Sequence, residues 1–135
     1  MNAQTNLQKL LSSMEPDLRP GEYAFTTVSP EDFRQLQIES WGWFREPEGI
    51  TLILEKNAAT AAGLKTAFSS RLITLKVYSS LEAVGFLAII TNRLAAAGIS
   101  VNAISAYYHD HLFVPTEKAK QALVILQQIM KENAK

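Results

Sequence analysis

The 135-residue chain contains no cysteine, which excludes disulfides, thiolate zinc sites and cysteine nucleophiles. It also lacks an excess of charge of either sign, because thirteen basic and thirteen acidic residues cancel. Proteins that grip phosphate backbones normally carry a basic excess, so nucleic acid is not expected as a partner. The composition, 47% hydrophobic and 19% charged, is typical of a globular protein rather than a disordered chain.

No part of the sequence has the pattern of a secretory signal or a membrane span. The first 20 residues lack a basic start followed by an apolar core. The longest apolar-rich stretch, residues 83–99, is interrupted by Thr91, Asn92 and Arg93 and falls short of the roughly 20 apolar residues that a span needs. We therefore expect a cytoplasmic protein that does not engage a membrane, and the absence of disulfides fits a reducing compartment.

The first half of the chain predicts a short leading helix and then a strand, a helix, a hairpin and a second helix. Leu7, Leu10 and Leu11 recur at helical spacing. Ser29 before Pro30 is a typical helix cap followed by proline at the first helical position. The expected elements are a helix over 6–13, a strand over 22–28, a helix over 30–36, a hairpin of 39–45 and 50–55, and a helix over 56–64.

The second half predicts the same order with a longer first helix. Ile73, Leu75 and Val77 alternate with more polar residues, as in a half-buried strand. Ser79 and Ser80 are candidate caps for the helix that follows. The expected elements are a strand over 72–78, a helix from residue 81 or 82 to 97 with Val84 on its apolar face, a hairpin of 101–107 and 111–114, and a last helix capped by Thr116.

The two halves form an internal repeat. Each is most of a βαββαβ unit, the ferredoxin-like arrangement. Neither half has an obvious fourth strand of its own, so a strand shared between the halves or between chains is expected. The predicted fold class is α+β, with two ferredoxin-like units packed as a pseudo-two-fold pair. The expected boundary separates an N-terminal unit with its leading helix, residues 1–65, from a C-terminal unit, residues 66–135.

Residues 73–115 resemble an ACT domain: a strand, a loop ending in Val84-Gly85, a helix, Ala97-Gly98-Ile99, and a strand bearing Asn102. The runs at 81–85 and 107–111 are similar to those of tandem ACT-like bacterial proteins of unassigned function, as are 20–23, 44–46 and 48–52 in the first half. Those proteins are related in fold to the regulatory ACT pair of aspartokinases and to cytosolic arginine sensors of animals. The resemblance covers the chain after about residue 15 and implies a regulatory protein with ACT units in tandem.

The loop from Ser79 to Phe86 is the main candidate ligand site. It leads from a strand to a helix N-terminus, where free N–H groups and the helix dipole attract a carboxylate. The resemblance implies that the next strand lines the same site. The candidate ligand-binding residues are Ser79, Ser80, Leu81, Glu82, Val84, Gly85, Val101, Asn102 and Ile104. The alternative is that the serines only cap the helix, Gly85 only permits packing, and Asn102 holds its own hairpin.

Two other groups of residues are candidates for a functional site. His109 and His111 are two apart and share a face if they lie on a strand, which suggests a metal site or an acid–base pair. The sequence offers no third metal ligand and no serine nucleophile in an elbow motif, so a structured turn is favoured. Trp41, Trp43 and Arg45 share a strand face, where packing is favoured over ligand stacking. We predict no catalytic residue, no metal and no cofactor.

The leading hypothesis is therefore a regulatory or sensor protein without catalytic activity that binds a small molecule, which the resemblance implies is an amino acid. Because no catalytic domain is evident in the sequence, a regulated partner would be a separate protein. The broad apolar surface of the helix over 81–97 and the missing strand favour a homodimer. The alternative is an ACT-type assembly or protein-interaction module that binds no ligand.

Overall fold

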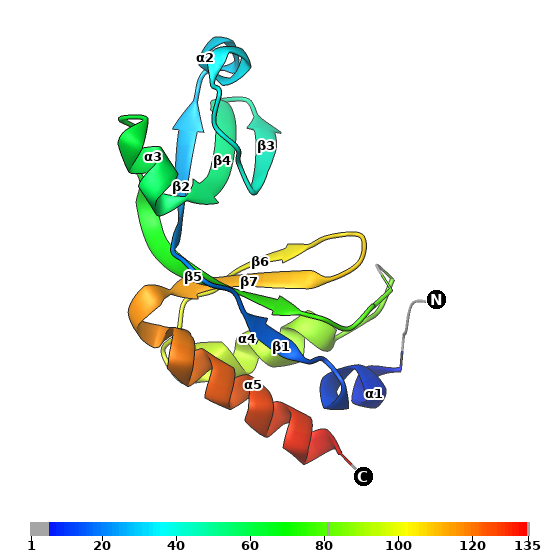
Figure 1. Cartoon of the computed structure of the whole chain (residues 1–135). Coiled ribbons are helices and arrows are strands. Elements are labelled where there is room, and N and C mark those ends of the chain that lie inside the picture. The colour runs from blue at the N-terminus through cyan, green and yellow to red at the C-terminus, as the bar shows by residue number, and fades with distance from the viewer. Residues whose placement is uncertain (1–5, 81, 135) are drawn as a thin grey trace. The chain divides into compact units, whose positions relative to one another are not determined.

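The computed structural model describes residues 6–80 and 82–134 (Figure 1). Its elements are α1 (Leu7–Ser12), β1 (Pro16–Leu18), β2 (Tyr23–Val28), α2 (Pro30–Gln35), β3 (Gly42–Glu46), β4 (Gly49–Glu55), α3 (Lys56–Ala61), β5 (Ala67–Leu75), α4 (Phe86–Ala96), β6 (Asn102–Ser105), β7 (Asp110–Pro115), the 3₁₀ turn η1 (Thr116–Lys118) and α5 (Ala119–Asn133). Within the described ranges, no helix is both long and apolar enough to cross a membrane. The chain divides into two compact units, which are described separately: residues 21–70, and residues up to 20 together with those from 71 onward.

The unit of residues 21–70 has the strand order β3-β4-β2-β5, in which only the first part of β5 takes part. β2 pairs antiparallel with β4, from Tyr23 opposite Glu55 to Val28 opposite Ile50. The hydroxyl of Ser29 accepts a hydrogen bond of 3.0 Å from the Asp32 N–H, so the predicted cap of α2 is confirmed. The core comprises Val28, Ile50, Leu52, Leu54 and Ala59, with Phe33, Leu36, Ile38 and Leu64 packed against it.

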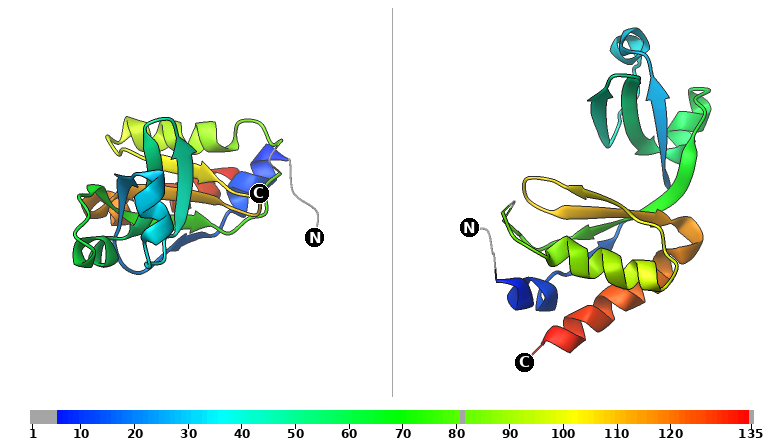
Figure 2. Two further views of the ribbon diagram at one scale, coloured as in Figure 1. Left: turned by 90° about the horizontal axis from the view of Figure 1, so that it is seen from above. Right: turned by 180° about the vertical axis from the view of Figure 1, so that it is seen from behind.

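The other unit has the strand order β1-β5-β7-β6, and α4 and α5 lie side by side over one face of this sheet (Figure 2). Its core is built by residues from every layer: Leu10, Leu11, Met14, Ile73, Leu75, Phe86, Ile90, Leu94, Ile99, Leu112, Val114, Ala119, Ala122, Leu126 and Ile129. Four residues of α5 are buried at steps of three and four along the helix: Ala119, Ala122, Leu126 and Ile129.

The strands that complete each ferredoxin-like unit come from outside its own repeat. The first part of β5 pairs with β2, with Tyr23 opposite Ser70. The last part of β5 pairs with β1, with Pro16 opposite Leu75. The N-terminal segment therefore supplies the strand that the second half lacks, and β5 serves both halves. The predicted α+β class with two ferredoxin-like units and a shared strand is confirmed, while the boundary between residues 65 and 66 stays a prediction.

The predicted bounds of two elements in the second half are wrong. β5 runs from Ala67 to Leu75 rather than from residue 72 to residue 78, and α4 begins at Phe86 rather than at 81 or 82. The Ser80 hydroxyl accepts a hydrogen bond of 3.0 Å from the Glu82 N–H, which closes a local turn instead of capping a helix. Val84 precedes the helix and has an exposed fraction of 85%, so it belongs to no buried face.

Two smaller corrections concern the second hairpin and the last helix. The strand that bears Asn102 was expected over 101–107, but β6 covers only Asn102–Ser105, is the last strand in its sheet order and pairs with β7. Thr116 opens the 3₁₀ turn η1 instead of capping the helix, and α5 begins three residues later. Proline at 115 and the tight turn that follows it delay the start of regular α-helix.

Candidate functional site

A pocket of about 140 Å³ lies at the N-terminus of α4. It is lined by the loop before the helix, the first turn of the helix, and the ends of the β6–β7 hairpin: Ser79, Ser80, Ala83, Gly85, Phe86, Leu87, Ala88, Ser105, Ala106 and Asp110. All of these residues belong to the unit that contains α4 and α5. The pocket is smaller than the roughly 300–1,000 Å³ of sites for drug-sized molecules, so only a small ligand fits.

The first turn of α4 offers hydrogen-bond donors to this pocket. Gly85 is the N-cap, with φ of 90°, and provides no side chain to bond the helix N-terminus. The Ile89 N–H donates to the Gly85 carbonyl at 3.1 Å, which is the first hydrogen bond of the helix. By helix geometry, the N–H groups of residues 86–88 then have no intrahelical acceptor, and all three residues line the pocket. This end of the pocket favours an anion.

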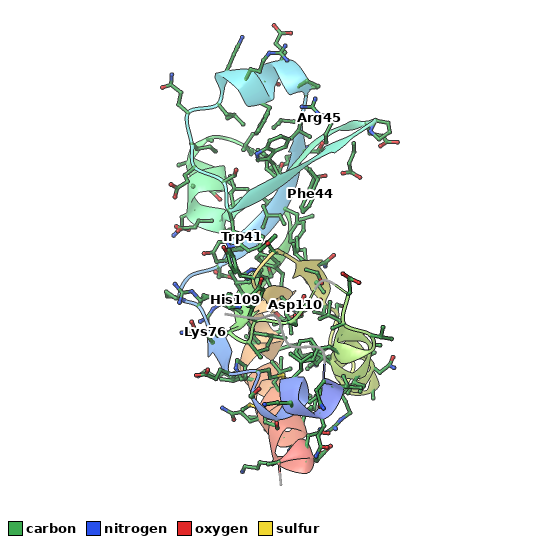
Figure 3. The ribbon with its side chains drawn as sticks, turned by 90° about the vertical axis from the view of Figure 1, so that its right-hand side faces the viewer. Trp41, Phe44, Arg45, Lys76, His109 and Asp110 are labelled. Atoms are coloured by element: carbon green, nitrogen blue, oxygen red, sulfur yellow. The ribbon has the colours of Figure 1, made fainter. Side chains whose placement is uncertain are left out.

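Asp110 places a carboxylate in the same pocket. The residue has an exposed fraction of 6% and begins β7, next to His109 in the turn (Figure 3). One of its oxygens accepts a hydrogen bond of 3.2 Å from the Ser79 hydroxyl. This carboxylate favours a cation, whereas the helix N-terminus favours an anion. The pocket therefore suits a small molecule that carries both charges.

The structure brings together only part of the predicted site. Ser79, Ser80 and Gly85 line the pocket, whereas the exposed Glu82 and Val84 belong to the same loop but do not line it. Val101, Asn102 and Ile104 do not line it either, and β6 instead contributes Ser105 at its end. The predicted Leu81 lies outside the described residues. Whether any of these residues binds a ligand stays a prediction.

Sequence reasoning missed Asp110 as a pocket residue. It read the aspartate as part of a turn, but the turn closes one residue earlier, where the Ala106 N–H donates to the His109 carbonyl at 3.0 Å. Asp110 opens a strand whose next four residues include the buried Leu112, Phe113 and Val114. The signal in the sequence was a charged residue directly ahead of a buried strand, a position where an acid needs a partner.

His109 and His111 flank Asp110, which lines this pocket. His111 Nδ1 is 3.0 Å from the Thr74 hydroxyl, and the two imidazole rings are 6.5 Å apart. Burial lowers the pKa of His111, the nearby His109 lowers it further, and Asp110 acts in the opposite direction. In the part of the chain that the structure describes, no group of three or more His, Cys, Asp or Glu side chains is arranged to hold a metal ion.

Aromatic residues gather in two exposed places. Tyr108 lies 5.6 Å from Tyr78 and 5.0 Å from Tyr107, measured between ring centroids. In the first hairpin, the centroids of the Trp43 and Phe33 rings are 4.9 Å apart, and the Arg45 guanidinium carbon lies 6.0 Å from the centroid of the Trp43 ring. The contact between Trp43 and Phe33 agrees with the packing interpretation of Trp43, because it places the ring against α2.

Comparisons with known proteins agree with the tandem arrangement. Two ACT-domain family models match the chain, one over residues 2–71 and the other over residues 68–128. Together they confirm the predicted pair of ACT units. No curated protein sequence matches the chain.

Solved structures give the same fold. A Vibrio cholerae protein of unknown function, described as a possible transport protein, shares 48% sequence identity with a TM-score of 0.80, over 92% of this chain and 95% of that one. The regulatory subunit of aspartate kinase from Thermus flavus has 12% identity and a TM-score of 0.67, over 84% of this chain and 95% of that one. E. coli aspartokinase III in complex with aspartate and ADP has 15% identity and a TM-score of 0.60, over 87% of this chain and 32% of that one. At this identity the two kinase matches show the fold alone.

Proposed function

The chain belongs to the ACT-domain family, and on this premise we propose that it is a regulatory protein that binds a small α-amino acid in the pocket at the N-terminus of α4. ACT domains commonly bind amino acids in regulatory proteins. One observation carries the proposal: the first turn of α4, with its N–H donors, and the Asp110 carboxylate line the same small pocket.

The proposed ligand lies with its carboxylate at the first turn of α4 and its ammonium group at Asp110. The N–H groups of residues 86–88 bind the carboxylate without a compensating side chain, because Gly85 has none. Asp110 is buried, so its attraction for an ammonium group is screened less than that of a surface acid. The small side chains of Ala83, Ser105 and Ala106 leave room for the remainder of a short amino acid.

The proposal includes no catalytic step. The family matches are to regulatory ACT domains, and aspartate kinase regulatory subunits share the fold. A regulated enzyme or other partner would then be a separate protein that responds to the bound amino acid. A homodimer stays part of the proposal, although one argument for it falls, because β1 already fills the place of the missing strand.

The test is a thermal-shift and calorimetric screen of the purified protein against the twenty amino acids. A ligand that binds only the folded state stabilises it by about 2.7 kcal/mol at a hundred times its Kd. Asp110→Asn keeps the shape of the side chain and an acceptor for Ser79 but removes the charge that holds the ammonium group. We expect this variant to weaken binding at least tenfold.

Glu82→Gln is the matched control, because it removes the same charge from an exposed residue of the loop that does not line the pocket. It should leave the affinity within about twofold. If Asp110→Asn and Glu82→Gln weakened binding equally, the cause would be the loss of negative charge anywhere near the loop. That result would contradict the proposed role of Asp110. If no amino acid raised the melting temperature, the alternative would be favoured, an ACT-type assembly module that binds a protein partner and no small molecule.

A further inference from the structure

A second pocket lies in the other compact unit, far along the sequence from the one at α4. Its volume is about 330 Å³, and its lining consists of Tyr23, Ile38, Glu39, Ser40, Trp41, Glu55 and Ala58. All seven residues belong to the unit of residues 21–70, so the pocket is complete within one part of the chain. The lining combines two aromatic rings with two carboxylates and contains no basic side chain.

The strand register explains why these side chains meet. Tyr23 is directly opposite Glu55 in the β2–β4 pair, so the ring and the carboxylate project on the same face. The Trp41 N–H donates to the Ile53 carbonyl at 2.7 Å, which fixes the segment before β3 beside the end of β4. Glu39 and Ser40 precede Trp41 in that segment and reach the same pocket. The position of Trp41 within this unit can be followed in Figure 3.

The carboxylates and aromatic rings of this pocket together favour a cationic ligand. The two glutamates are exposed, and within residues 6–80 and 82–134 neither one forms an ion pair. The faces of tryptophan and tyrosine attract cations, and methylated ammonium groups are the ligands most often bound between such rings. A carboxylate near the rings adds a long-range attraction that aromatic faces alone do not provide.

We propose that this pocket binds the alkylammonium group of a small molecule, with Trp41 and Tyr23 against its methyl groups and Glu39 and Glu55 balancing its charge. The volume is at the lower end of the range for small-molecule sites and suits a trimethylammonium head group with a short tail. This site is distinct from the amino-acid pocket, because the two share no residue.

The chain offers a direct optical readout. It contains two tryptophans, and only Trp41 lines the pocket, whereas Trp43 packs against Phe33. In a Trp43→Phe protein the tryptophan fluorescence, excited at a wavelength that tyrosine does not absorb, therefore reports Trp41 alone. Titration with choline or tetramethylammonium should change this emission in a saturable way, at an ionic strength held constant with NaCl.

The uncharged choline analogue 3,3-dimethylbutan-1-ol tests the role of charge, because it has nearly the same shape. We expect it to bind at least tenfold more weakly than choline. The double variant Glu39→Gln/Glu55→Gln, made in the Trp43→Phe protein, should also bind choline at least tenfold more weakly, with an unchanged melting temperature. The proposal is supported if choline binds saturably, the neutral analogue binds more weakly, and the double glutamate variant loses affinity for choline.

Glu48→Gln is the matched control for the carboxylates. Glu48 lies in the β3–β4 turn, at the opposite end of β4 from Glu55, roughly 20 Å away along the strand. This substitution should leave choline binding unchanged, as should Asp110→Asn at the other pocket. No saturable change with either cation, equal binding of the neutral analogue, or full affinity in the double glutamate variant would overturn the proposal.

Discussion

At the scale of single residues, Gly49 is a position where the backbone demands glycine. It begins β4 with φ of 154°, a backbone conformation that residues with a side chain rarely adopt. A Cβ atom there would lie 2.9 Å from the Thr27 hydroxyl oxygen and 3.0 Å from the Val28 carbonyl oxygen. The second neighbour is backbone of the paired strand β2, so it cannot move aside without disturbing the sheet.

Gly49→Ala should therefore destabilise the protein, by about 2 kcal/mol or more, through backbone strain and the close contact with β2. The control is Gly42→Ala, at the first residue of β3, where an added Cβ meets nothing within 4 Å and φ is not positive. This second change should alter the free energy of unfolding by less than about 1 kcal/mol. Urea denaturation measures the free energy of unfolding of both variants. An equal decrease in the two would contradict the steric explanation.

Single residues also show where sequence reasoning reached its limit. The cap at Ser29 was predictable because serine, proline and two acids occur within four residues, and a cap depends only on such local contacts. Ser80 resembles a cap equally well, yet its hydroxyl bonds the Glu82 N–H in a separate turn. Asp110 acquires its place in the pocket from Ser79, 31 residues earlier in the chain. No local pattern contains such a contact, so part of the site was missed.

At the scale of elements, the neighbouring strands β5 and β7 are joined by a side-chain contact as well as by their backbones. Thr74 on β5 and His111 on β7 approach to 3.0 Å. Burial keeps the pKa of His111 below its usual value of 6.5, with His109 acting in the same direction and Asp110 against it. The folded protein therefore takes up a proton at His111 less readily than the unfolded chain does.

This difference predicts a loss of stability in mild acid. As the pH falls through the pKa of the unfolded histidine, the unfolded chain gains the proton first, so the free energy of unfolding decreases. The decrease from this residue ends once the pH passes below the lower pKa of the folded state. His111→Gln should make the loss between about pH 8 and pH 5.5 smaller than in the parent protein, measured by urea denaturation at each pH.

His109→Gln is the comparison, because it removes the other histidine of the chain but leaves His111 half-buried against Thr74. We expect most of the acid sensitivity to remain in this variant, since burial is the largest cause of the shift at His111. A His111→Gln protein with the acid sensitivity of the parent would show that His111 is as readily protonated in the folded state as in the unfolded chain.

The order of elements was more predictable than their ends. The alternation of Ile73 and Leu75 and the three-to-four spacing along α5 follow from burial on one face, which a sequence displays directly. The start of α4 was placed about four residues too early, since the loop before Gly85 is also rich in apolar residues. What ends that loop is the left-handed backbone of Gly85, and a glycine after an apolar residue does not by itself reveal that conformation.

At the scale of the whole molecule, the N-terminal segment completes the unit that contains the C-terminus. Leu10, Leu11 and Met14 are buried in the same core as α5. The Arg19 N–H donates to the Leu72 carbonyl at 2.8 Å, and the Lys76 N–H donates to the Glu15 carbonyl at 3.2 Å, on either side of the β1–β5 pair. The segment thus covers an edge of β5 that would otherwise present unpaired backbone groups.

A chain that begins at Gly21 should therefore lose the cooperative folding of the C-terminal unit, because it loses three buried apolar side chains and a strand. Removal of even one such side chain, as in Leu10→Ala, typically costs about 2–5 kcal/mol. Circular dichroism melts and amide hydrogen exchange of the β5 and β7 amides measure the loss. Unchanged protection in the truncated chain would show that β1 and α1 are only an addition to a unit that is stable without them.

A circular permutant separates the loss of contacts from the loss of length. The Gln8 side-chain amide donates to the Asn133 carbonyl at 3.1 Å, so the start of α1 lies beside the end of α5 (Figure 1). A short Gly/Ser linker from residue 134 to residue 6 can therefore bridge the two ends in a chain that starts at Gly21 and ends at Pro20. This permutant should regain the cooperative melt and the protection of β5, since β1 returns to the same edge. If it remained unfolded while the parent folded, the direct covalent link from β1 to β2, rather than the packing of α1 and β1, would be the feature that stabilises this unit.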